Sequence, residues 1–153
     1  MKNLVGFLVG EVRYAVDILK VREIINPLTI VDLPHAPPAV LGVADHRGEV
    51  VPIIDLRQRF ALPRATETRR TKWIIVSLEA PGGPSAAGLV VDAVTDVFGA
   101  GSDSQRDIPK IGAEDARGIT TVYARHDGLT FVLDVDLVAA AAEEIDISRV
   151  AAP

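Results

Sequence analysis

Short apolar runs, rather than long helical repeats, dominate the pattern of hydrophobic and polar positions along the chain. Val5 to Val9 and Val12 to Val16 form two such runs, and Gly10-Glu11 between them predicts a tight β-hairpin. Asp127-Gly128 predicts a second hairpin. Further strands are predicted over residues 29–33, 50–56, 72–78, 87–91, 122–125 and 129–133. About ten short strands are typical of a β-barrel or a sandwich.

In one segment the spacing of apolar residues changes from every second residue, as in a strand, to the spacing of a helix. In residues 17–25, Ile18, Val21 and Ile25 recur at helical spacing behind Asp17, a good N-cap, so one or two helical turns are predicted there. Residues 65–72 and 99–118 show no sustained period and contain many turn-forming residues, which predicts loops. The strand over 50–56 contains Pro52, which has no backbone donor. We therefore expect that strand at a sheet edge, or bulged at the proline.

Two sequence patterns each occur twice. An apolar pair followed by an aspartate and Val-x-acid-apolar occurs around Asp17 and Asp92, and the strings IIDL and VLDV place Asp55 and Asp134 after similar strands. The offsets, 75 and 79 residues, are close to each other. Chance similarity and internal duplication both remain open, since short apolar strings ending in Asp are common in β proteins. A duplication would place two similar small barrels side by side, with a seam serving as both core and groove.

Composition and charge narrow the class of protein. The 153 residues fit one domain, or two very small ones with a shared core, and 48% hydrophobic with 24% charged residues is typical of a globular protein. A net charge of −5 with scattered basic residues argues against nucleic acid as a partner. Without cysteine there is no disulfide and no thiolate site. The N-terminal residues do not form a signal peptide, and no apolar run is long enough to span a bilayer, so a cytoplasmic protein without membrane insertion is expected.

The segment GVADHRGEVVPIIDLRQRF, residues 42–60, concentrates titratable side chains around one apolar strand. Asp45, His46 and Asp55 could be imagined as a metal or acid–base site with Arg47 as an electrophile. However, alternate strand residues point to opposite faces, and nothing makes the turn residues converge on Asp55. No nucleophile elbow or phosphate-binding glycine loop occurs either. We therefore expect no catalytic residues, no metal and no cofactor.

The same residues suit recognition better than catalysis. Arg47 beside Gly48 at the tip of a turn presents a planar fork that can pair with a carboxylate of a partner, although a solvated turn arginine is the simpler alternative. The four aspartates that follow apolar pairs are interpreted as caps or turn hydrogen bonds. Apolar residues on more than one face of residues 17–25 leave some of them available to a partner protein.

Four motifs together resemble the CheW-like domain family, the coupling proteins of bacterial chemosensory arrays. They are VDILKVREI (residues 16–24), LPHAPPAVLGVADHRGEVVPIIDLRQRF (33–60), AGLVVDAVTDV (87–97) and FVLDVDLV (131–138). The resemblance spans about residues 5–140 and implies a single CheW-like domain over residues 1–153. It implies a mostly β fold of two five-stranded SH3-like barrels packed side by side, with short helices including one near the C-terminus. The expected subdomains are about 14–64 with the C-terminal helix and about 72–135, and the strand 4–9 could pair with either.

The resemblance also implies partners and the surfaces that bind them. The protein would be a non-enzymatic adaptor that binds the regulatory domain of a CheA-type histidine kinase and the cytoplasmic tip of a methyl-accepting chemoreceptor; other CheW-like proteins are a further expected partner. The residues on the kinase side would be Val21, Glu23, Ile24, Arg47 and Gly48.

A groove between the two barrels would bind a helical hairpin of the receptor by its apolar residues. Its border would consist of Val43, Val90, Val91 and Val94. The alternative function is a small-molecule sensor that uses this groove as its ligand pocket. A hydrolase or metalloenzyme with an unrecognised site is a third possibility.

The turn departs from the family pattern at two positions. Members commonly have Asn-Leu-Arg-Gly where this chain has Asp45-His46-Arg47-Gly48. An added carboxylate at a recognition tip can repel one partner and attract another, so Asp45 and His46 are expected to affect partner specificity.

Overall fold

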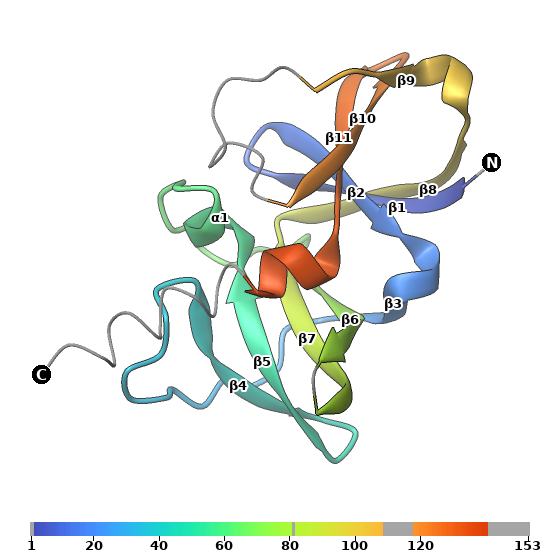
Figure 1. Ribbon diagram of the computed structural model, residues 1–153. Helices are drawn as coiled ribbons and strands as arrows, with labels where there is room; N and C mark the ends of the chain where they lie inside the picture. Colours follow the sequence, from blue (N-terminus) through green and yellow to red (C-terminus); the bar gives the residue numbers. More distant parts are fainter. Residues whose placement is uncertain (1, 81, 109–117, 141–153) are drawn as a thin grey trace, which may run out of the picture.

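Two β-sheets and a few short helices make up the computed structural model, which describes residues 2–80, 82–108 and 118–140 (Figure 1). The strands are β1 (Lys2–Val9), β2 (Val12–Asp17), β3 (Val21–Ile25), β4 (Val40–His46), β5 (Glu49–Asp55), β6 (Lys72–Ala80), β7 (Gly83–Val91), β8 (Ala93–Ala100), β9 (Gln105–Arg106), β10 (Ile119–Arg125) and β11 (Gly128–Leu133). The helical segments are η1 (Ile18–Lys20), α1 (Leu56–Arg59), η2 (Ser102–Ser104) and residues 135–140. The expected mostly β fold with short helices, including one near the C-terminus, is confirmed.

Each half of the chain contributes strands to both sheets. The five-stranded sheet has the order β3-β6-β7-β5-β4, and the six-stranded sheet has the order β8-β1-β2-β11-β10-β9. Apart from β9, which has no counterpart, the two orders correspond strand by strand. Each sheet contains one parallel pair at the equivalent place, β7 with β5 and β2 with β11. This correspondence supports the internal duplication inferred from the repeated aspartate patterns.

The sheets divide the chain differently from the contiguous subdomains expected over 14–64 and 72–135. The early strand β2 lies in the six-stranded sheet with β10 and β11, whereas β6 and β7 lie beside β3, β4 and β5. The N-terminal strand β1 pairs with β2 and β8. The physical reason is that β3 and β8 each leave the hairpin that precedes them and pair with the first strand of the other repeat. Such an exchange of strands leaves no signal in local sequence.

Burial explains why several strands are apolar on both faces. In β6, Trp73 and Ile75 face a core inside the five-stranded sheet, whereas Ile74 and Val76 face a second core formed by both sheets. We call this second cluster the shared core; it includes Phe7 of β1 and residues of the helical segment 135–140. Successive strand residues point to opposite faces, so a strand lying between two cores requires a continuous apolar run. Figure 1 shows the helical segment between the two sheets.

The predicted hairpins are confirmed, but the helical prediction for residues 17–25 is only partly right. β1 pairs with β2, and β10 pairs with β11. Asp17 caps a single 3-10 turn, and its carboxylate accepts a hydrogen bond from the backbone of Leu19 at 3.0 Å. Residues Val21–Ile25 are strand β3 rather than helix. Their β-branched side chains favour a strand, and β6 supplies the partner for the hydrogen-bond ladder.

The prediction that Pro52 marks an edge strand or a bulge is wrong. β5 lies between β7 and β4, and the register shift in its pairing with β4 occurs between Val40 and Gly42. The pairing of β5 with β7 begins at Ile53. Pro52 therefore precedes that ladder, and its missing N–H removes no bond to β7.

Of the other predicted elements, the strand over residues 29–33 reduces to a bridge of Val31 with Val43. Residues 65–71 contain neither helix nor strand, as expected. The loop expected over 99–118 begins with the end of β8 and contains η2 and β9, and its residues 109–117 lie outside the described part of the chain.

Candidate functional site

The turn between β4 and β5 has a conformation that few residue pairs adopt. Both central residues have positive φ, 54° at Arg47 and 83° at Gly48. This combination matches the right-handed twist of a hairpin and favours glycine, whereas it strains arginine. The Asp45 carboxylate accepts a hydrogen bond from the backbone of Gly48 at 2.9 Å, which holds the turn closed. The family-atypical Asp45 thus has a structural role in the turn.

The carboxylate of Glu23, on β3, contacts the side chains of two residues at this turn. The Arg47 guanidinium donates from Nε to Glu23 Oε2 at 2.8 Å and from Nη2 to Oε1 at 2.7 Å. His46 Nε2 lies 2.9 Å from the same Oε2. These contacts, the Arg47 hydrogen bonds above all, lower the pKa of Glu23 to about 2, and the pair with Glu23 raises the pKa of Arg47. Glu23 is therefore ionised at neutral pH.

This geometry corrects one expectation about Arg47. Its fork was expected to be offered to a partner carboxylate, but it is engaged by Glu23 within the chain. The Arg47 side chain remains 73% exposed. The surface thus presents a fixed carboxylate–guanidinium pair rather than a free arginine.

A second arginine, Arg22, braces the same end of the five-stranded sheet. Its guanidinium donates to Ser77 Oγ at 2.8 Å, to Glu49 Oε2 at 3.0 Å and to the Ser85 carbonyl at 3.2 Å. These partners belong to β6, β5 and β7, so one side chain ties β3 to three other strands. The sequence analysis missed this residue, because its partners lie 27 to 63 positions away.

The other two residues expected on the kinase side differ in exposure. Val21 is half-buried and packs against the shared core, whereas Ile24 is 38% exposed. Val21, Glu23 and Ile24 all lie on β3, an edge strand of its sheet. Ile24 is thus the apolar member of this set that is open to a partner.

The four valines expected to border the receptor groove differ in exposure. Val91 is 1% exposed within the shared core, so its side chain is not available to a receptor. Val90 and Val94 are half-buried on β7 and β8, and Val43 is half-buried on β4, where its backbone pairs with that of Val31. The expected role of Val91 is therefore wrong, because successive residues of β7 face two different cores.

Three of the four repeated aspartates have the capping role expected of them. The carboxylates of Asp17, Asp55 and Asp134 accept hydrogen bonds from backbone N–H groups two residues further on. Asp134 also accepts from Leu137 at 3.2 Å, at the start of the helical segment 135–140. These are short-range contacts, which explains why sequence pattern alone predicts them.

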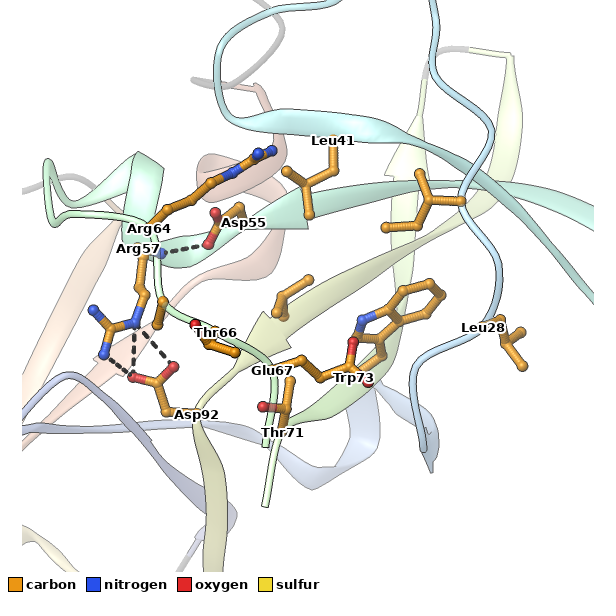
Figure 2. Close-up of a pocket in the computed structure, with 13 residues that line it drawn as sticks. Leu28, Leu41, Asp55, Arg57, Arg64, Thr66, Glu67, Thr71, Trp73 and Asp92 are labelled. Carbon is orange, nitrogen blue, oxygen red and sulfur yellow. Dashed lines mark hydrogen bonds and ion pairs between the residues drawn. The ribbon is translucent and has the colours of Figure 1, made fainter. Parts of the chain in front are cut away.

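Asp92 has a different role, which links the two sheets. Its carboxylate accepts a 2.6 Å hydrogen bond from the backbone of Gly10, in the β1–β2 turn. Arg57 of α1 donates from Nε and Nη2 to the same carboxylate at 2.9 to 3.1 Å (Figure 2). This contact raises the pKa of Arg57. The repeated pattern marked Asp92, but the identity of its partners could not be read from the sequence.

A hollow of about 250 Å³ adjoins this ion pair. Its apolar lining includes Leu28, Leu41 and Trp73 (Figure 2). Its polar lining includes Arg64, Thr66 and the carboxylates of Asp55 and Glu67. The hollow lies at the end of the five-stranded sheet opposite to the Arg47 turn, since Leu41 is the second residue of β4 and Arg47 follows its last residue. The two ends are separated by about 20 Å of strand.

The titratable residues of the β4–β5 hairpin do not form a joint site. Asp45 lies beside the turn, whereas Asp55 ends β5, so about 17 Å of strand separates them. In residues 2–80, 82–108 and 118–140, no group of three or more His, Asp or Glu side chains could hold a metal ion. Across the same described ranges, no helix is both long and apolar enough to cross a membrane.

Comparison with known proteins identifies the family. Residues 3–143 match the CheW-like domain. The chain is 35% identical over 131 residues to the chemotaxis protein CheW of Rhizobium meliloti, covering 81% of this chain and 80% of that protein. It is 30% identical over 146 residues to the chemotaxis protein CheW of Klebsiella aerogenes, covering 95% of this chain and 86% of that protein.

A solved structure gives the same answer. The crystal structure of the scaffolding protein TtCheW from Thermoanaerobacter tengcongensis superimposes with a TM-score of 0.78 at 27% sequence identity, covering 90% of this chain and 86% of that chain. Sequence and fold therefore agree over nearly the whole chain, which belongs to the CheW-like domain family.

Proposed function

We propose that this protein is a non-enzymatic coupling protein that links methyl-accepting chemoreceptors to a CheA-type histidine kinase. The observation that carries the proposal is that residues 3–143 match the CheW-like domain and that the fold agrees with a CheW structure over 90% of the chain. An adaptor acts by holding partners in a fixed relation, which requires rigid surfaces rather than reactive groups. Because the receptor partner would be bound at its cytoplasmic tip, the proposal implies a cytoplasmic protein.

The surface proposed to bind the regulatory domain of the kinase is centred on the Arg47 turn. Glu23 holds Arg47 in one orientation by two hydrogen bonds, and Gly48 gives the turn its shape. Ile24 and the exposed part of the Val21 side chain, both on β3, supply apolar contact area. Pre-organised charged groups beside an apolar contact are typical of residues that dominate binding energy.

The receptor is proposed to bind by an apolar face of a helical hairpin, with Val43, Val90 and Val94 as half-buried contacts. Val91 is left out of this surface because it is buried. Substitution of Val94 by Asp would place a carboxylate in that contact. Loss of receptor binding with retained kinase binding would support the assignment, and equal loss of both would contradict it.

Asp45 and His46 are proposed to affect which kinase is bound. Asp45 holds the turn, and His46 contacts Glu23, so both residues influence how Arg47 is presented. An Asp45→Asn/His46→Leu variant is expected to change the order of affinities among kinases of several pathways. An unchanged order would end this assignment.

The function itself is tested by reconstitution. Receptor-containing membranes, the kinase and this protein are mixed, and the sedimented kinase and its autophosphorylation are measured with and without receptor ligand. We expect this protein to increase both kinase sedimentation and receptor control of autophosphorylation. The same kinase activity and sedimentation with and without this protein would refute the proposal.

The small-molecule sensor receives less support. The hollow beside Trp73 measures about 250 Å³ and a second one, bordered by Arg69 and Arg70, about 450 Å³, but both are open to solvent, whereas ligand pockets enclose most of the ligand. The fold agreement with coupling proteins points to protein partners instead.

A further inference from the structure

The loop before β6 carries a charge opposite to that of the whole chain. Residues 64–72, RATETRRTK, contain three arginines and one lysine but only one acidic residue, Glu67, which gives a net charge of +3. The whole chain has a net charge of −5. All residues from 64 to 70 are exposed. A local positive field of this kind attracts anionic groups from solution.

The arginines of this loop differ from the others in the described part of the chain. Five other arginines pair with the carboxylates of Asp127, Glu49, Glu23, Asp92 and Asp96, and Arg106 donates to backbone carbonyls. Arg59 also interacts within the chain. Arg64, Arg69 and Arg70 make no side-chain hydrogen bond or ion pair with any described residue. Three guanidinium groups without an internal acceptor are therefore concentrated on one loop. Guanidinium forks are suited to bidentate pairing with carboxylates.

The loop also has a defined backbone conformation. Thr68 and Thr71 exchange hydrogen bonds, from Thr68 N to Thr71 Oγ1 at 2.9 Å and from Thr71 N to the Thr68 carbonyl at 3.2 Å. Thr68 Oγ1 accepts from Arg70 N at 3.1 Å, and Lys72 Nζ donates to the Arg69 carbonyl at 2.9 Å. Arg69 and Arg70 are thus presented by a closed turn, which lowers the entropy lost when a partner binds.

Two adjoining hollows flank the loop and differ in chemistry. The first is the hollow of Figure 2, where Arg64 extends along the rim towards Leu41, above an apolar wall that includes Leu28 and Trp73. The second, of about 450 Å³, is bordered by Arg69 and Arg70. Thr66 and Thr71 line both hollows, so the two hollows lie next to each other along the loop.

We propose that loop 64–72 and its hollows bind an acidic segment of a partner protein that carries an apolar anchor residue. The anchor would enter the hollow beside Leu28 and Leu41, and flanking carboxylates would pair with Arg64, Arg69 and Arg70. The concave apolar wall favours a peptide over a membrane, since a flat anionic bilayer would contact the arginines but leave the hollow unused. This surface lies at the opposite end of the five-stranded sheet from Arg47, so it is independent of the proposed kinase contact. It adjoins the proposed receptor contact, because Val90 lines the first hollow.

The test uses the full chain and a labelled peptide, EDELFEDE, titrated by fluorescence anisotropy at low salt. An Arg64→Gln/Arg69→Gln/Arg70→Gln variant is expected to bind the peptide roughly tenfold more weakly. The matched control, Lys2→Gln/Arg13→Gln/Arg106→Gln, removes the same charge from the six-stranded sheet. It is expected to bind within about twofold of the unmodified chain, because only long-range attraction is reduced. Thermal unfolding of all three proteins shows whether the fold is retained.

Additional variants test whether the apolar contact contributes to binding beyond charge attraction. A peptide without the anchor, EDESSEDE, and the exposed-residue variant Leu28→Ser are each expected to weaken binding about fivefold. Equal affinity of the two triple variants would overturn the proposal, as would equal affinity for both peptides. Vesicles with about 30 mol% phosphatidylserine that bind the unmodified chain more strongly than the triple Arg variant, without peptide binding, would assign the loop to a membrane and also overturn it.

Discussion

The contact of Asp92 with Gly10 and Arg57 predicts a measurable contribution to stability. Asp92→Ala removes a 2.6 Å hydrogen bond to Gly10 and the carboxylate that pairs with Arg57. Each hydrogen bond to a charged group contributes about 1.5–3 kcal/mol, and breaking a fully buried ion pair costs about 3–5 kcal/mol. The two side chains are 23% and 28% exposed, so water can partly replace the lost partner and the lower end applies.

We therefore expect Asp92→Ala to lower the free energy of unfolding by about 2–3 kcal/mol. For a chain of this size that corresponds to a decrease in Tm of about 4–12 °C. The assay is urea unfolding monitored by circular dichroism, with thermal unfolding as a second probe. Asp103→Ala is the matched control, because the Asp103 carboxylate is exposed and makes no hydrogen bond or ion pair with the described residues.

A double-mutant cycle separates the ion pair from the turn hydrogen bond. Asp92→Asn, Arg57→Gln and the double variant should give a coupling free energy of about 1 kcal/mol or more. If Asp92→Ala and Asp103→Ala differ by less than about 0.5 kcal/mol, the reasoning that Asp92 holds the two sheets together is refuted.

Three further predictions follow from the Arg47 turn and from the glycines. The pKa of Glu23 is lowered from 4.5 to about 2. The stability that its ionised carboxylate contributes is therefore fully present above about pH 4.5 and is lost as the pH falls towards 2. The difference in Tm between the unmodified chain and Glu23→Gln should shrink over that range. Arg47→Ala should weaken kinase binding, measured by calorimetry, by about 2 kcal/mol with the fold retained. Gly42→Ala should lower the free energy of unfolding by about 3 kcal/mol, because φ is +147° and the new Cβ would overlap the Val31 carbonyl oxygen. Gly48→Ala, with no atom within 4 Å of its Cβ, should lower the free energy of unfolding by only about 1 kcal/mol.

Controls and contrary outcomes differ among these three experiments. For the pH series, Glu67→Gln removes an exposed carboxylate of the loop, and a Tm difference for Glu23→Gln that is constant from neutral pH down to pH 2 would contradict the assigned pKa. For kinase binding, Arg106→Ala removes an arginine of the other sheet, and equal affinities of the two variants would remove Arg47 from the interface. For the glycines, equal losses would show that backbone φ alone, rather than close approach, decides the cost.

Local sequence determined much of the secondary structure. The β1–β2 and β10–β11 hairpins follow from turn residues between apolar runs, and the caps at Asp17, Asp55 and Asp134 involve backbone groups two residues away. These interactions act over a few residues, so the same chemistry operates wherever the segment lies in the fold. The repeated patterns also indicated a duplication, which the corresponding strand orders support.

Residues 21–25 show where local pattern fails. The apolar spacing behind Asp17 indicates helix, but β6 offers a ladder of hydrogen bonds to this segment, and a strand results. Propensity differences between helix and strand amount to about 1 kcal/mol or less per residue, so tertiary pairing overrides them.

Only the tertiary structure decided which side chains form the surfaces. Glu23 and Arg47 lie 24 positions apart, and Arg57 and Asp92 lie 35 apart, so nothing local selects either pair. β3 and β4 are the two edges of the five-stranded sheet, so the contact of Glu23 with Arg47 requires that these edges approach each other. Arg57 and Asp92 follow β5 and β7, which pair in parallel and therefore end side by side. Long-range pairs of this kind form only when the chain has folded and brought distant segments together, whereas caps and turns depend only on neighbouring residues. The sequence alone therefore determined the caps and turns, and the fold decided the long-range pairs.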